Sequence, residues 1–150
     1  MAPKFSLQTV LDVRHSKVEA LEIDLGKLQL AQQEKIALEE TLQRLKLNLF
    51  GQLQEQMIGD MDLVLIEQLR SNIDQVEEGI QVTRQVIEEL GKRIEAKRRE
   101  LVIARQEEET LDILKRKEQD RFAAEVRRKE NNLQDDLYIS RIYRMRNQSV

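Results

Sequence analysis

The 150-residue chain contains no cysteine, no tryptophan, one proline and five glycines, and aromatic residues make up only 3% of it. Without cysteine it forms neither disulfides nor thiolate metal sites. Its one histidine, His15, cannot build a metal site alone, so we expect no metal and no cofactor. The apolar residues are mostly leucine, isoleucine and valine. They are enough for a thin helical seam but too few for the core of an ordinary globular domain.

Long hydrophobic runs are also missing. No stretch approaches the ~20 apolar residues that a membrane-spanning helix needs. The opening residues 1–4 lack the apolar region of a secretory signal. We therefore expect a cytoplasmic protein, associated with a membrane only through partners.

Motifs for catalysis are absent as well. The glycines never cluster into a phosphate-binding loop of the GxxxxGK[ST] or GxGxxG type. A Ser-His-Asp or Cys-His set cannot be assembled around one histidine near the start. Exposed carboxylates on a helical surface are poor acid–base catalysts. We expect that the protein is not an enzyme.

What the chain has is charge: 35% of its residues are Asp, Glu, Lys or Arg. Together with abundant leucine and glutamine and few breakers, this is typical of coiled coils. The strongest break is Gly59, followed by aspartates that can cap a helix. We predict one domain over residues 1–150, with a helix over about 6–57 capped by Ser6, a turn at about 58–61, and a helix from about 61 to about 145.

Heptad spacing is clearest in the second predicted helix. One seam position repeats every seven residues at Ile66, Ile73, Ile80, Ile87, Ile94 and Leu101, and its companions are Leu69, Val76, Thr83, Leu90, Lys97 and Ala104. Such a repeat indicates a left-handed coiled coil. The first helix supplies Val18, Leu21, Leu25, Leu28, Ala31, Leu38, Leu42, Leu45 and Leu49. There we expect a stammer, a local slip of the repeat, between Leu28 and Ala31.

The heptad ends where a hairpin partner would end. If the turn lies near 59–60, residues whose numbers sum to about 119 face each other, as Leu25 and Ile94 do. The next seam positions along the second helix are polar: Glu108, Lys115, Glu118 and Glu125. We predict an all-α fold, a long antiparallel two-helix coiled-coil hairpin with a C-terminal single-helix overhang. A parallel dimer of one continuous helix is the alternative.

The overhang differs in charge from the rest of the chain. Residues 115–150 carry 10 Lys or Arg and 6 Asp or Glu, whereas residues 1–114 carry 15 and 22. One reading is an amphipathic basic helix that docks into an acidic groove or ring lumen. The other is a solvated, frayed helix. Nucleic acid is disfavoured because acidic residues interleave with the basic ones.

Both ends of the chain resemble the flagellar FliJ proteins. The opening Phe5-Ser6-Leu7-Gln8-Thr9-Val10-Leu11-Asp12-Val13-Arg14 is similar to the family's F-x-L-x-x-V-L-x-x-R start. The family's ending is matched by Ala104-Arg105, by residues 111–117, by Arg128-Lys129-Glu130 and by Leu133-x-Asp135-Asp136. Gln134 departs from the leucine that the family has before its acidic pair. The resemblance covers nearly the whole chain.

This resemblance implies a soluble component of the flagellar type III export apparatus, similar to the central stalk of rotary ATPases. Its expected partners are the hexameric export ATPase, the cytoplasmic part of the export gate and export chaperones, which would hold it at the inner face of the cell membrane. The residues expected to contact the ATPase are Phe5, Leu7, Arg14, Arg116, Phe122, Arg127 and Arg128. Phe5 and Leu7 could equally pack on Leu111 and Leu114. The distal half of the hairpin would contact the gate.

Other functions remain open from the sequence alone. One is the equivalent stalk of an injectisome or of a rotary proton-pumping ATPase. Another is a generic coiled-coil scaffold that dimerises in parallel, with a mass near twice the 17.7 kDa of the chain.

Overall fold

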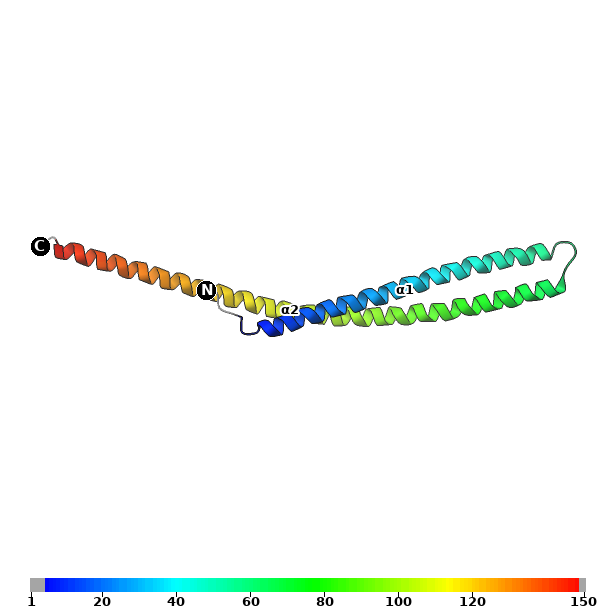
Figure 1. Cartoon of the computed structure of the whole chain (residues 1–150), viewed down its shortest axis with the longest axis horizontal. Helices are drawn as coiled ribbons and strands as arrows, with labels where there is room; N and C mark the ends of the chain where they lie inside the picture. The colour runs from blue at the N-terminus through cyan, green and yellow to red at the C-terminus, as the bar shows by residue number, and fades with distance from the viewer. Residues whose placement is uncertain (1–4, 149–150) are drawn as a thin grey trace. The chain divides into compact units, whose positions relative to one another are not determined.

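Two long helices make up most of the structure, a computed structural model that describes residues 5–148 (Figure 1). They are α1 (Gln8–Gln56) and α2 (Leu63–Gln148), and no strand occurs among these residues. The prediction of an all-α chain with two helices and a central break is confirmed. α1 is slightly shorter than the expected 6–57, and α2 begins later than 61 and continues past 145. The predictions about residues 1–4 lie outside the described part.

The chain divides into two compact units, which we describe separately. The terminal unit contains Met1–Val18 and Ala104–Val150, and the hairpin unit contains Glu19–Ile103. Each unit therefore draws on both helices.

The break between the helices follows from two residues. Gly59 has a φ of 87°, in the left-handed region that glycine adopts without steric cost. Asp62 caps α2, because its Oδ1 accepts hydrogen bonds from the backbone N of Val64 at 3.1 Å and of Leu65 at 3.4 Å. The cap is thus the second aspartate after the glycine.

The start of α1 differs from the prediction. The backbone N of Gln8 donates to the carbonyl O of Phe5 at 3.0 Å, and that of Leu11 donates to Leu7 at 2.9 Å. A backbone turn thus precedes the helix, and carbonyl groups of this turn accept hydrogen bonds from the first backbone amides of the helix. Ser6 lies inside this turn and not at the predicted N-cap, which moves the helix start from 6 to 8.

In the hairpin unit, α1 and α2 lie side by side (cyan and green in Figure 1). Lys46 Nζ lies 3.3 Å from Glu77 Oε1, and Arg84 Nε lies 2.7 Å from Glu39 Oε1. Further along, Gln32 Nε2 donates to the carbonyl O of Ile87 at 3.4 Å. As the residue number falls along α1 it rises along α2, which is the packing of a hairpin. The facing numbers sum to between 119 and 123 rather than to 119 throughout.

The α2 side of this seam follows the predicted heptad. Its buried members in the hairpin unit are Ile66, Leu69, Ile73, Ile80, Thr83, Ile94 and Leu101. Thr83 is the one polar residue among them, and its Oγ1 donates to the carbonyl O of Gly79 at 2.7 Å. That hydrogen bond satisfies the buried hydroxyl within the helix, so threonine fits an apolar seam.

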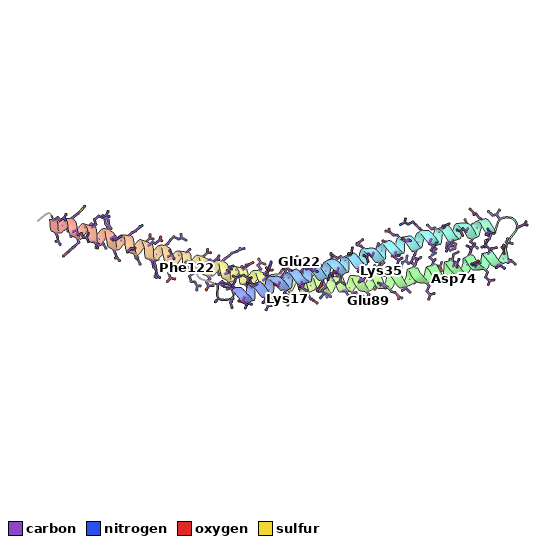
Figure 2. All side chains as sticks on the ribbon, viewed as in Figure 1. Lys17, Glu22, Lys35, Asp74, Glu89 and Phe122 are labelled. Atoms are coloured by element: carbon purple, nitrogen blue, oxygen red, sulfur yellow. The ribbon has the colours of Figure 1, made fainter. Side chains whose placement is uncertain are left out.

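The α1 side corrects the prediction of a stammer. Leu38 and Leu45, expected in the seam, are 41% and 42% exposed. One set of buried or half-buried positions instead alternates by four and three residues without a slip, with Gln29, Ala31, Ile36 and Gln43 half-buried beside it: Leu21, Leu25, Leu28, Gln32, Lys35, Glu39, Leu42, Lys46, Leu49 and Leu53. Long polar side chains cover the seam with their aliphatic stems while their heads reach polar partners or water. A search for apolar residues alone therefore missed the true register. Figure 2 labels Lys35 on α1.

Candidate interaction surface

The terminal unit holds all seven residues that the sequence singled out. Where the N-terminal turn lies beside α2, a surface hollow is lined by Phe5, Ser6, Leu7, Leu114, Lys117, Glu118 and Arg121. Its α2 members are spaced by three and four residues, so they share one face of the helix. We refer to these seven residues as the N-terminal hollow.

Two predicted residues, Phe5 and Leu7, line this hollow together with Leu114. Phe5 is half-buried and Leu7 is 40% exposed. Both lie beside Leu114, which is one of the two residues named in the packing alternative. Both also keep part of their apolar surface open to a partner. Leu111, the other residue of that alternative, is half-buried on α2.

The charged residues of the hollow are of both signs. Lys117 and Arg121 are exposed, and Glu118 between them is half-buried. Among the described residues, Glu118 Oε2 is a buried oxygen that accepts no hydrogen bond. A buried acceptor without a donor costs free energy, so Glu118 is held there by the packing of its neighbours.

Arg14 is engaged within the chain. Its guanidinium forms a half-exposed ion pair with Glu107 of α2. One residue further, His15 Nδ1 lies 2.7 Å from Glu108 Oε1. Leu11, three residues before Arg14 and four before His15 on the same face of α1, is buried. Arg14 thus tethers α1 to α2 in the terminal unit, whatever it does toward a partner.

The remaining predicted residues lie along α2 and are not among the residues that line the hollow. Arg116, Arg127 and Arg128 are exposed, and Phe122 is half-buried (labelled in Figure 2). Arg116 and Arg127 are eleven residues apart and share a face of the helix, because eleven residues are close to three turns. From residue 127 to residue 148, every described side chain is exposed.

Sequence reasoning missed five charged residues of this surface: Glu107, Glu108, Lys117, Glu118 and Arg121. The facing rule did not reveal the first two, because numbers that sum to 119 place Arg14 opposite Arg105 and His15 opposite Ala104, whereas the observed pairs join Arg14 to Glu107 and His15 to Glu108. The sequence predicts that the seam fails at Glu108, whereas Glu108 is half-buried and bonded to His15.

Neither a metal centre nor a membrane span emerges from residues 5–148. Within that range, no three His, Cys, Asp or Glu residues come close enough together to hold a metal ion. Over the same residues, neither helix is apolar enough over a sufficient length to cross a bilayer.

Comparison with known proteins gives one match. The family model described as flagellar FliJ protein matches residues 3–147, nearly the whole chain. Comparisons with curated proteins and with solved structures found no match. The family match agrees with the resemblance at both ends of the sequence. On this match, the chain belongs to the FliJ family, a family of non-catalytic components of the flagellar protein export apparatus.

Proposed function

We propose that the protein is a stalk-like component of the type III export apparatus that inserts into the hexameric export ATPase ring or helps it assemble. In this proposal it also links the ring to the cytoplasmic part of the export gate and to cargo chaperones. The chain acts as an antiparallel coiled-coil hairpin whose C-terminal helix extends as an overhang. The protein itself performs no hydrolysis.

The observation that carries the proposal is the exposure of α2 beyond residue 126. A helix packed against its own chain buries a stripe of side chains, but all described residues from 127 onward are exposed. An exposed helix of this kind can be enclosed by a partner without first being released from its own chain.

Charge supports the same assignment. Residues 115–150 have four more basic than acidic residues, whereas residues 1–114 have seven more acidic than basic ones. A net positive helix is attracted to an acidic groove or lumen, and the attraction orients it so that this end enters first. The lumen of a ring is a site where one helix can be surrounded on all sides.

The hairpin unit supports the linking role. Cross-helix contacts at three levels, from Lys46–Glu77 to Gln32–Ile87, hold α1 and α2 together over much of this unit. Two helices packed along a shared seam resist bending more than one does. A paired segment of this kind is suited to holding two partners at a fixed separation.

The test replaces two adjacent arginines, Arg127→Glu and Arg128→Glu, in the full-length protein. The exchange places negative charge where an acidic lumen would lie, and like-charge contact costs several kcal/mol. We expect stimulation of the purified export ATPase to fall by roughly tenfold or more. Circular dichroism should show unchanged helix content.

A matched control reverses two adjacent basic residues of the hairpin unit, Lys92→Glu and Arg93→Glu. Both are exposed, and their ion pairs are with Glu88 and Glu89 on their own helix, at 3.9 and 3.0 Å. The net charge changes equally in the two double variants. Equal loss in both would show that total charge matters and not the end of α2, and full stimulation by the arginine variant would refute insertion by this end.

A further inference from the structure

The last described turns of α2 have an unusual composition. Residues 137–148 contain three arginines, Arg141, Arg144 and Arg146, and no acidic residue. The same twelve residues contain both tyrosines of the protein, Tyr138 and Tyr143. In contrast, residues 115–136 mix basic with acidic side chains throughout. We refer to residues 137–148 as the basic-aromatic segment.

The apolar side chains of this segment lie mostly on one face of the helix. At 3.6 residues per turn, one arc contains Tyr138, Ile139, Ile142, Tyr143 and Met145. All five are exposed, with fractions from 36% for Ile142 to 67% for Tyr143. Ser140, Arg141 and Arg144 lie on the remaining arc together with Leu137, whereas Arg146 lies within the apolar arc. Residues 138–145 of the segment therefore form an amphipathic helix whose apolar face no described residue covers.

We propose that the basic-aromatic segment binds directly to the surface of an anionic lipid bilayer. The helix would lie parallel to the membrane plane, with its isoleucines and Met145 among the acyl chains just below the headgroups. Helices with an apolar face and a basic polar face bind membranes in this way. Arg141 and Arg144 would contact lipid phosphates.

Three observations favour lipid over a protein groove. The charge of the segment is of one sign over its whole length, as an anionic surface requires and as a groove with specific ion pairs does not. Its two aromatic residues are tyrosines, which concentrate where a membrane meets water. Its apolar side chains are flexible or branched aliphatic ones, and arginine stems can extend from the helix to the headgroups.

This proposal goes beyond the proposed function. Membrane association only through partners was the expectation from the sequence. Direct lipid contact by the segment would add an attachment that needs no partner. It would concentrate the protein at the membrane before the export ATPase is bound.

The test uses the full-length protein with two kinds of vesicles, phosphatidylcholine alone and phosphatidylcholine mixed with phosphatidylglycerol. Because the chain has no tryptophan and both tyrosines lie in the segment, tyrosine fluorescence reports on this segment alone. We expect the protein to sediment with the mixed vesicles only. Their addition should protect the tyrosines from quenching by acrylamide, and rising salt should reverse both effects.

Two double variants locate the contact. Arg141→Glu with Arg144→Glu should weaken partitioning to mixed vesicles by roughly tenfold or more, since each basic residue near an anionic surface contributes measurably. Ile139→Ser with Ile142→Ser should weaken it comparably. The control, Ile58→Ser with Val64→Ser, changes two highly exposed apolar residues beside Asp60 and Asp62 and should bind as the unchanged protein does.

Sedimentation without tyrosine protection would overturn the proposal, as would segment variants that bind the mixed vesicles as well as the unchanged protein does. If no vesicle binds the protein while the segment variants lose ATPase stimulation, the occupant of the face is a protein and the lipid proposal fails. The vesicle assay contains no ATPase. Its failure therefore leaves the proposed function standing.

Discussion

At the scale of single residues, Glu118 combines two properties that rarely occur together. It lines the N-terminal hollow among charged and apolar neighbours, and one of its carboxylate oxygens is buried without a donor. It also stands at a heptad position, where an apolar residue would continue the seam of α2. The polar group thus interrupts packing that its position favours.

Replacing this residue tests that reading. Glu118→Leu removes the unsatisfied oxygen and adds apolar contact beside Phe5 and Leu114, so the free energy of unfolding should rise by about 1 kcal/mol. Urea unfolding followed by circular dichroism measures the change. Asp120→Leu, at an exposed position on the same turn, should change stability by less than about 0.5 kcal/mol. A loss of stability in Glu118→Leu would mean that the carboxylate has a favourable partner.

At the scale of the helices, the seam of α1 shows what apolar spacing can and cannot predict. The α2 heptad was read correctly because isoleucine occupies nearly every position of one repeat. In α1, Leu38 and Leu45 have the right chemistry but lie just outside the seam, while Lys35 and Glu39 lie in it. Burial of aliphatic stems leaves no hydrophobic signature in the sequence.

The two registers make opposite predictions for a pair of leucines. Leu42→Ala should lower the free energy of unfolding by about 2 kcal/mol, because the side chain is half-buried against α2. Its Cδ1 lies 3.6 Å from where a Cβ on Gly79 would stand. Leu38→Ala should cost less than about 1 kcal/mol. If thermal or urea unfolding shows equal losses of unfolding free energy in the two variants, the predicted stammer is correct and the register described above is wrong.

The interaction surface was also predicted in part: its apolar residues were placed correctly, and its ion pairs were not. The closeness of Phe5 and Leu7 to Leu114 follows from the facing rule of a hairpin, so sequence alone could place them. The pairs formed by Arg14 and His15 with glutamates of α2 did not emerge, since charged residues are frequent on all faces and single out no partner. Their identification required the coordinates.

At the scale of the whole molecule, the prediction concerns whether the helices pair within one chain. The absence of native cysteine allows Asp24→Cys and Arg98→Cys to be labelled specifically, at two exposed positions of the hairpin unit. Packed helix axes lie about 10 Å apart, so paired spin labels should report a distance below roughly 30 Å.

A single continuous helix would separate the same two positions by about 110 Å at ~1.5 Å per residue. Labelled protein diluted with unlabelled protein isolates the distance within one molecule. Light scattering should give a mass near 17.7 kDa. Twice that mass, together with loss of the short distance on dilution, would favour the parallel dimer and remove the basis for the stalk proposal.

The seam of the hairpin unit is uneven along its length. Near the turn it contains Leu49, Leu69 and Ile73, and at the other end of the unit Leu21 and Leu101 are buried, but between them α1 contributes glutamine, lysine and glutamate. The polar seam positions of α1 lie between Leu28 and Leu42, so apolar contact from α1 is weakest in that middle stretch. On heating, the two helices of such a pair separate first in the middle of the seam, while the packed segments on both sides stay together. The helices would thus loosen in mid-span without unzipping from the turn, and the hairpin would re-close in its original register.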